Sequence, residues 1–191
     1  MKSIIENVTD DIWKIRANSN IYFLDFEKKI IIDTGDRGLR QQTKQFLLKV
    51  VSLDKVEIVI FTHLHYDHIG NFDLFSDAKF YASQDAISDY KNNPEGTVLV
   101  KDIAEKFKKI NLKPIHDEIQ GLKVIKTPGH TKGSICLWYE KEKILFSGDT
   151  LFGKKSHGRL DLPTSVPGNM RESLMNLVKY NYKILCPGHD Y

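Results

Sequence analysis

The 191-residue sequence has few cysteines and no long apolar run. Its two cysteines, Cys136 and Cys186, lie in apolar segments without metal-binding spacing, which predicts buried free thiols in a reducing compartment. No apolar run approaches the roughly 18 to 20 residues that a membrane-spanning helix needs, and the acidic N-terminal residues do not resemble a signal sequence. These absences predict a cytoplasmic protein without a membrane partner.

An excess of charge of one sign is also absent. The sequence has 28 Lys and Arg residues against 25 Asp and Glu residues, a net charge of +3, without a run of five or six like charges. This balance argues against dedicated nucleic-acid binding, so the expected partner is a small-molecule substrate, and the oligomeric state stays open. The length allows one substantial core, and we therefore predict a single domain over residues 1–191.

Short apolar segments rich in Ile, Val and aromatic residues predict eight strands. They cover residues 21–26, 29–33, 57–61, 79–82, 122–126, 134–139, 143–146 and 183–186. Helical periodicity predicts helices over residues 39–50, 85–90, 98–110 and 169–180. The weakly patterned segments 91–96 and 111–121 are expected to be surface loops that contact substrate.

A weak internal repeat relates residues 21–32 to residues 135–146. Each copy is a strand, a charged turn and a second apolar strand. Each second strand leads to an aspartate near a glycine, Asp33 in the first copy and Asp149 in the second. The simplest structural interpretation is a duplicated β-hairpin, and hence two similar sheets packed face to face with helices outside.

Four potential metal ligands follow the predicted strand 57–61 within six residues: His63, His65, Asp67 and His68. Alternate side chains of a strand point to the same face, so His63 and His65 can face one ion. The chain must then turn, which directs Asp67 and His68 toward a second ion. One short motif can therefore serve two metal ions.

Three further ligand-type side chains, His130, Asp149 and His189, each follow a predicted strand and have glycine beside them. Crowded imidazoles and carboxylates are unfavourable unless a cation offsets their repulsion and desolvation, so the set predicts a metal centre. His116 belongs to no such pattern, and we assign it no role in the site. His157 is a candidate for the substrate mouth.

The motif T-H-L-H-Y-D-H, with the later Gly-His, Gly-Asp and Pro-Gly-His signals, resembles the metallo-β-lactamase superfamily from about residue 12 to the C-terminus. Within it, the segments T-P-G-H-T-K-G-S and L-F-S-G-D-T-L-F and the final H-D-Y are similar to the glyoxalase II group. The resemblance implies an α+β fold, the αβ/βα sandwich of two packed mixed β-sheets with helices on the outer faces. That fold agrees with the hairpin repeat.

The resemblance also implies a site for two divalent metal ions. One ion would be bound by His63, His65 and His130, the other by Asp67, His68 and His189, and Asp149 would bridge them. Asp67 and Asp149 are then the catalytic carboxylates. Asp33 fits either a residue that orients a ligand or a turn residue. Zinc suits these ligands, but iron(II) and manganese(II) do as well.

The implied activity is hydrolysis of a 2-hydroxyacyl thioester by a metal-bridging hydroxide, as in hydroxyacylglutathione hydrolase. The sequence departs from that group because His189 is two residues from its end, so we expect no C-terminal helical domain that binds glutathione. Lys154, Lys155 and Arg159 follow Asp149 and either meet an anionic substrate or form an ordinary solvated loop.

Two other activities occur on the same fold. A persulfide dioxygenase would hold one iron(II) with His63, His130 and Asp149, and the segment 158–161 is similar to that group too. A lactone or β-lactam hydrolase is the second alternative. A non-catalytic binding module is disfavoured by the complete ligand set.

Overall fold

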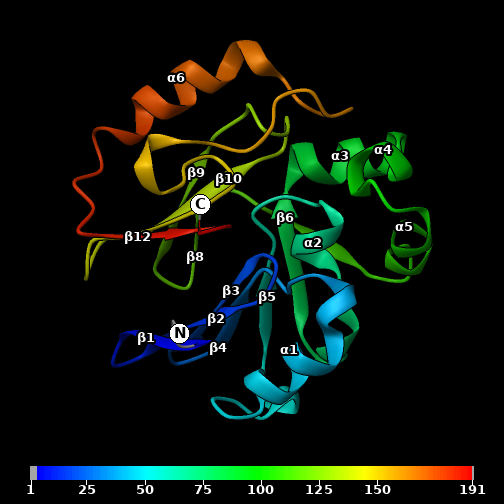
Figure 1. Ribbon diagram of the computed structural model, residues 1–191, viewed down its shortest axis with the longest axis vertical. Helices are drawn as coiled ribbons and strands as arrows, with labels where there is room; N and C mark the ends of the chain where they lie inside the picture. The colour runs from blue at the N-terminus through cyan, green and yellow to red at the C-terminus, as the bar shows by residue number, and fades with distance from the viewer. Residues whose placement is uncertain (1–3, 191) are drawn as a thin grey trace.

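The computed structural model describes residues 4–190, and it arranges them as two β-sheets packed face to face (Figure 1). The first sheet has the order β1-β2-β3-β4-β5-β6-β7. Its strands are β1 (Ile5–Thr9), β2 (Ile12–Arg16), β3 (Asn20–Asp25), β4 (Lys29–Ile32), β5 (Ile58–Ile60), β6 (Lys79–Ser83) and β7 (Leu112–Ile115). The second sheet has the order β12-β11-β10-β9-β8. Its strands are β8 (Glu118–Ile119), β9 (Leu122–Lys126), β10 (Ile135–Tyr139), β11 (Ile144–Gly148) and β12 (Ile184–Pro187).

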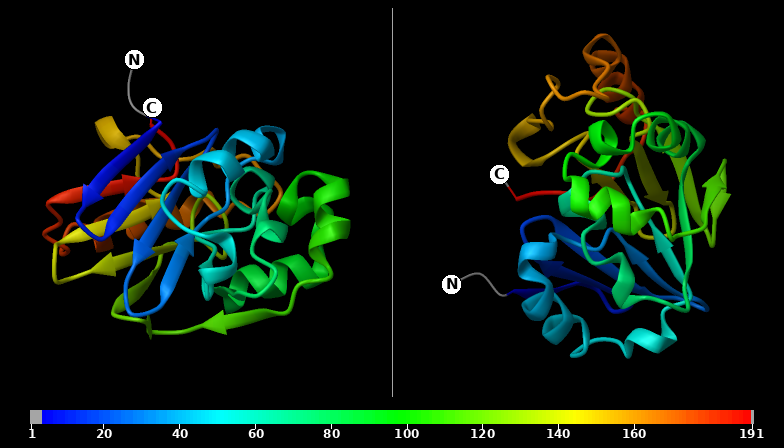
Figure 2. Two further views of the ribbon diagram at one scale, coloured as in Figure 1. Left: turned by 90° about the horizontal axis from the view of Figure 1, so that it is seen from below. Right: turned by 90° about the vertical axis from the view of Figure 1, so that its right-hand side faces the viewer.

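Helices cover the outer sides of the sheets, as the turned views show (Figure 2). They are α1 (Arg40–Leu47), α2 (Tyr66–Ile69), α3 (Gln84–Asn92), α4 (Pro94–Val98), α5 (Lys101–Phe107) and α6 (Pro167–Leu177). The helix α6 lies over the second sheet, at the top of Figure 1, and α1 lies on the side of the first sheet. None of the helices within residues 4–190 is long and apolar enough to cross a membrane.

Successive side chains along the central strands enter different apolar layers, because a strand directs them to opposite faces. In β4, Ile30 and Ile32 join the core between the sheets, whereas Ile31 joins the core that contains residues of α1, α3 and α5. In β10, Leu137 joins the core between the sheets, whereas Trp138 packs with residues of α6. The layers are therefore helix, sheet, sheet and helix, which confirms the predicted fold class.

Both halves of the sequence repeat form the expected hairpin. Strands β3 and β4 are antiparallel, with Tyr22 opposite Ile32, and β10 and β11 are antiparallel, with Leu137 opposite Phe146. In each half the second hairpin strand also pairs in parallel with a later strand, β4 with β5 and β11 with β12. Parallel strands need a long crossover, and the helices α1 and α6 lie within these crossovers.

The two loop predictions were wrong. Residues 91–96 lie mainly in α3 and α4, where the Asn93 side chain accepts a hydrogen bond from the Gly96 amide and Pro94 begins α4. Residues 111–121 contain β7, which pairs with β6, and β8, which pairs with β9. The helix predicted over residues 98–110 is interrupted at Leu99, whose backbone φ is 69°. Pairing with neighbouring strands and helix capping determine the secondary structure of these segments. Neither effect is visible in the hydrophobic periodicity of the sequence.

Candidate metal centre

Every ligand-type side chain predicted from the sequence lies just beyond a strand. His63 and His65 follow β5, and the chain then turns into α2, which contains Asp67 and His68. His130, Asp149 and His189 follow β9, β11 and β12 respectively. The structure brings all seven of these residues together in one cluster that spans both sheets, and all but the half-buried Asp67 are buried.

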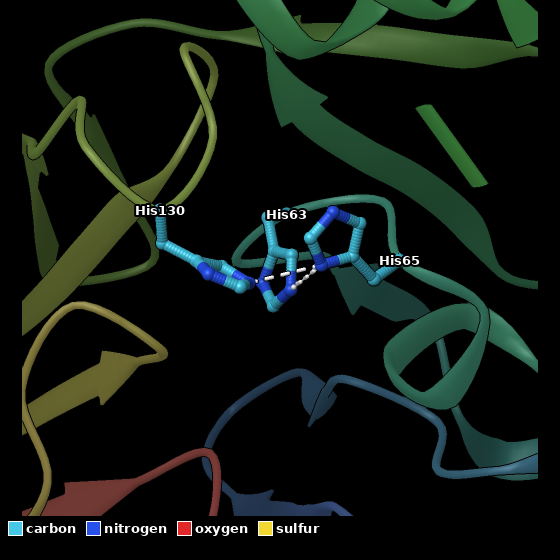
Figure 3. A group of neighbouring side chains, drawn as sticks. All are labelled: His63, His65 and His130. Atoms are coloured by element: carbon cyan, nitrogen blue, oxygen red, sulfur yellow. Dashed lines mark hydrogen bonds between the residues drawn. The ribbon is translucent and has the colours of Figure 1, made fainter. Parts of the chain in front are cut away.

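A first group consists of His63, His65 and His130 (Figure 3). The Nδ1 atom of His65 lies 3.1 Å from His63 Nε2 and 2.9 Å from His130 Nε2. All three side chains are at most 3% exposed. Their nitrogens point toward one another, as Figure 3 shows, and so face a common point.

A second group consists of Asp67, His68 and His189. His189 Nε2 lies 3.4 Å from His68 Nε2 and 3.3 Å from a carboxylate oxygen of Asp67. Asp149 lies between the two groups, because its carboxylate oxygens are 3.3 Å from His68 Nε2, 3.5 Å from His130 Nε2 and 3.5 Å from His189 Nε2.

Hydrogen bonds to groups around the cluster fix which nitrogen of each imidazole faces the cluster. Asp33 Oδ2 accepts from His68 Nδ1 at 2.8 Å and from the Thr62 hydroxyl at 2.8 Å. Since the Thr62 hydroxyl donates its proton to Asp33, it accepts from His63 Nδ1 at 3.2 Å. The Nε2 atoms of His63 and His68 are therefore left with lone pairs toward the cluster.

Backbone carbonyls do the same for two other imidazoles. The carbonyl oxygen of Arg159 accepts from His130 Nδ1 at 2.7 Å, and that of Asn18 accepts from His189 Nδ1 at 2.9 Å. Only His65 is reversed: its Nδ1 faces the cluster, and its Nε2 is buried without a hydrogen-bond partner in the described structure. Sequence analysis missed these carbonyls and Thr62, because a backbone acceptor leaves no signal in the residue pattern.

Electrostatics favour the protonation states that metals require for five of the seven ligands. Burial lowers the pKa of His63 and of His130, and burial with the nearby His130 lowers the pKa of His65 to about 3. Burial opposes ionisation of Asp67 and Asp149, but neighbouring imidazoles, His68 first, outweigh it and lower the pKa of both carboxyls. Neutral imidazoles and charged carboxylates are the forms that bind metal ions.

The other two imidazoles, His68 and His189, have the opposite shift. Burial favours the neutral form of His68, but the carboxylates of Asp149, Asp33 and Asp67 outweigh burial and raise its pKa well above the ordinary value. Asp67 and Asp149 likewise outweigh burial at His189 and raise its pKa. The shift of the His68 pKa shows how much negative charge surrounds one imidazole. A divalent cation would neutralise the same carboxylates in place of that proton.

The residues present fit bound divalent ions. Asp149 Oδ1 is buried, and its contact with His68 Nε2 at 3.3 Å does not have hydrogen-bond geometry, a costly arrangement unless another partner is bound. Lone pairs of several imidazoles converge on the same space, which is also unfavourable without a cation. The mixture of imidazole and carboxylate donors suits zinc, iron(II) or manganese(II).

The hairpin formed by β2 and β3 holds the strand end that supplies His189. The Asn20 amide donates to the Gly188 carbonyl at 2.7 Å, and the Tyr22 hydroxyl donates to the Pro187 carbonyl at 2.8 Å. Next to His189, Asp190 accepts from Lys14 Nζ at 2.5 Å and also pairs with Arg16. The first sheet therefore positions a ligand that belongs to the second.

A cavity of about 430 Å³ opens onto the cluster. Its lining includes the ligands His65, Asp67, His130, Asp149 and His189, with Asn18, Tyr66, Leu99, Phe152, Ser156, His157, Gly158, Arg159 and Leu162. His157 and Arg159 are thus at this cavity, as suggested from the sequence, but both are exposed, and Arg159 pairs with Asp161 at 2.7 Å.

Other suggested contacts are not in the cavity lining. Lys154 and Lys155 are exposed and lie outside it, and neither segment 91–96 nor segment 111–121 contributes a residue. Leu99, which sequence analysis did not single out, lies in the lining because its left-handed backbone separates α4 from α5. His116 does not line the cavity either.

A sandwich that gathers histidines and aspartates at the ends of its strands has the features of a metal-binding hydrolase. A family model described as the metallo-beta-lactamase superfamily matches residues 16–189. The chain belongs to this superfamily.

Two curated relatives are similar in sequence. A "Probable metallo-hydrolase" of Methanocaldococcus jannaschii is 31% identical over 187 residues, which cover 90% of this chain and 87% of the relative. A hydroxyacylglutathione hydrolase of Pelagibacter ubique is 33% identical over 143 residues, which cover 71% of this chain but 52% of the relative. The match thus spans about half the length of that second enzyme.

Two solved structures share the fold. A metallo-beta-lactamase family protein of Thermus thermophilus has a TM-score of 0.79 at 20% identity, with 97% of this chain and 75% of the other covered. A protein solved in a di-iron-bound form has a TM-score of 0.69 at 24% identity, with 91% and 88% covered.

Proposed function

We propose that this protein is a hydrolase with two divalent metal ions and that it cleaves a thioester, with a 2-hydroxyacyl thioester as the first candidate. The observation that carries the proposal is the cluster of seven ligand-type side chains, six of them buried, in which Asp149 lies between two groups of three. His63, His65 and His130 would hold one ion, Asp67, His68 and His189 the other, and Asp149 would contact both.

Divalent ions held by these residues would supply a water molecule acidified into the neutral pH range and positive charge that polarises a carbonyl oxygen. The protein's own residues position these groups. Asp33 and the carbonyls of Arg159 and Asn18 fix the imidazole rings by accepting their Nδ1 protons. Rings held in this way need little reorganisation during the reaction.

A cysteine nucleophile is not needed and does not fit. Cys136 is fully buried in β10, does not line the cavity, and burial raises its pKa to about 11. A thiol in this state is a poor nucleophile at neutral pH. The acyl group would therefore be attacked by activated water.

The cavity wall supports an acyl thioester with a negatively charged part. Leu99, Phe152 and Leu162 supply apolar surface, while His157 and Arg159 place polar groups near the exposed end of the cavity. The hydroxyacylglutathione hydrolase among the relatives acts on such a compound. The proposed partner is accordingly a small molecule in the cytoplasm, and no nucleic acid or membrane takes part.

Zinc is the proposed metal, and the similarity to a protein solved in a di-iron-bound form makes iron the competing choice. The test is a panel of substrates offered to protein loaded with zinc or with iron: an S-2-hydroxyacylglutathione, an acyl thioester of coenzyme A, a lactone, a β-lactam and glutathione persulfide. Thiol release from a thioester, without oxygen uptake, supports the proposal. Oxygen uptake with the persulfide, or cleavage of the lactone or β-lactam alone, would replace it with one of the two alternatives.

A further inference from the structure

A second cavity, of about 730 Å³, lies on the helix-covered side of the first sheet and shares no lining residue with the cavity at the metal centre. It is bounded by the end of α5, by β6 and the edge strand β7, and by the 3₁₀ turn Phe72–Leu74. We call it the α5 cleft. None of the residues assigned to the metal centre touches it.

The apolar floor of the α5 cleft is held in place by the core. Phe80 stacks on Phe61 with ring centroids 6.1 Å apart, and Phe72 meets Phe107 edge to face at 5.1 Å. Phe61 and Phe107 are themselves fully buried and in contact at 5.5 Å. The floor is therefore a fixed aromatic surface, since its rings cannot turn away without disturbing the core.

The lining of the α5 cleft carries five cationic side chains and one carboxylate: Arg37, Lys79, Lys106, Lys109 and Lys113, with Asp73. This net charge of +4 exceeds the +3 of the whole chain. Asp73 is already engaged, because Arg37 pairs with it at 3.0 Å and Arg40 pairs with it as well.

The four lysines of the α5 cleft have no carboxylate within 4.0 Å among residues 4–190. Only four lysines among residues 4–190 have such a partner, for example Lys29 with Asp25 and Lys108 with Glu105. The cleft lysines are therefore distinguished by gathering around one cavity, and not by being unpaired. A single lysine is a common protection of an edge strand such as β7, but that function does not call for cations from α5 and β6 as well.

We propose that the α5 cleft binds a small organic molecule with a flat apolar body and two or more negative charges. The volume is in the range of small-molecule sites, which combine an apolar surface with a few polar groups at defined positions. The aromatic floor would contact the apolar body, and the unpaired cations would meet the charges. The like charges around the cleft repel one another, and a bound dianion relieves that repulsion.

The test uses 1,5-naphthalenedisulfonate as the probe and 1,5-naphthalenediol as its uncharged counterpart, with binding followed by amide chemical shifts of the isotope-labelled protein. The variant Lys106→Ala/Lys109→Ala removes two cleft charges. The variant Lys101→Ala/Lys108→Ala is the matched control, because it removes two lysines of the same helix region that lie outside the cleft.

We expect the disulfonate to shift amides in residues 72–80 and 106–113, with at least about fivefold weaker binding to the cleft variant and unchanged binding to the control. Binding should weaken as salt is added, since the contacts are exposed ion pairs. The proposal is overturned by shifts confined to the metal cavity, by no shifts, by equal affinities for the two variants, or by equally strong binding of the diol. None of these results depends on hydrolysis.

Discussion

Each imidazole of the metal centre has two nitrogens with different tasks, and the outer one decides how the inner one is presented. His68 illustrates this at the scale of single residues: its Nδ1 donates to Asp33 at 2.8 Å, which leaves Nε2 free to bind a metal ion. Asp33 itself has a backbone φ of 56°, a left-handed conformation that is uncommon for residues other than glycine. Such strain at a position beside a site is consistent with a requirement of that site.

Asp149→Ala should remove bound metal and hydrolysis together. Asp149 lies within about 3.5 Å of imidazoles from both ligand groups, so both ions would lose a ligand and a negative charge. Loss of a residue that only hydrogen-bonds to a metal ligand lowers metal affinity by about 10- to 100-fold. Because Asp149 is itself a proposed ligand, we expect its loss to lower metal affinity by at least about 100-fold. Metal content after dialysis and turnover measure this, and His116→Ala is the control that changes neither. Normal turnover by the Asp149 variant would disprove its role.

Asp33→Asn should weaken metal binding without removing a ligand. The carboxylate accepts bonds from the Thr62 amide, the Thr62 hydroxyl and His68 Nδ1, and an amide nitrogen in its place would face a donor. We expect a loss of about 10- to 100-fold in affinity for one ion, measured by competition with a chromophoric chelator. Asp117→Asn, at an exposed position, is the matched control. Equal affinities in the two variants would show that Asp33 is only a turn residue.

At this scale the sequence predicted the seven ligand candidates, because histidine and aspartate beside glycine at strand ends form a visible pattern. It left Asp33 open between two roles, and the structure places it behind His68. The acceptors for His130 and His189 are backbone carbonyls of Arg159 and Asn18. Any residue type supplies a carbonyl, so no sequence pattern reveals these contacts.

At the scale of elements, close approach between the ends of β11 and β12 shapes the centre. The Gly188 amide donates to the Gly148 carbonyl at 2.7 Å, and a Cβ atom at Gly188 would lie 2.1 Å from Asp149 Oδ1. Glycine is required there because a side chain would occupy the space of the Asp149 carboxylate.

Gly188→Ala should therefore disrupt the metal centre, whereas Gly168→Ala should not. A Cβ at Gly168, in α6, meets nothing within 4 Å, and replacing glycine in a helix adds about 0.5 to 1 kcal/mol of stability. We expect lower metal content and lost hydrolysis in the first variant, and normal content with a slightly higher melting temperature in the second. Full metal occupancy in the Gly188 variant would contradict the close contact described above.

Elements with a continuous apolar pattern were predictable, and those that depend on a neighbour were not. The hairpin strands β3, β4, β10 and β11 alternate between two cores and are rich in β-branched and aromatic residues. Strands β1 and β2 carry polar residues such as Glu6 and Lys14, and their pairing with β3 makes them strands. Strand β7 likewise depends on β6. Strand propensity is weak compared with such pairing.

At the scale of the whole molecule, buried thiols link stability to pH. Burial raises the pKa of Cys136 to about 11 and that of Cys186 to about 12, from about 9. The folded state therefore keeps these protons at a pH where the unfolded state loses them. The resulting stability is complete below about pH 9 and decreases as the pH rises from about 9 to 11.

For Cys136 alone this amounts to about 1 kcal/mol per pH unit over that range. We expect the free energy of unfolding in urea to fall accordingly between pH 9 and pH 11. The decline should be smaller in Cys136→Ala, which lacks one of the two thiols, and alkylation by iodoacetamide at pH 8 should be slow until the protein unfolds. A pH dependence identical in the two proteins would contradict the assignment.

The metal centre is also a property of the whole molecule, because its ligands come from both halves of the chain. His63 to His68 follow the first sheet's β5, whereas His130, Asp149 and His189 follow strands of the second sheet. The packing of two similar halves creates a site that neither half contains alone. The metal centre therefore forms only when both halves fold and pack together.

The most direct test of this account is the number and identity of metal ions per chain, measured by elemental analysis after anaerobic loading with zinc and iron in competition. The account predicts two ions per chain in the wild type, with zinc as the preferred metal. One tightly bound iron per chain would contradict it and favour oxygen chemistry at His63, His130 and Asp149.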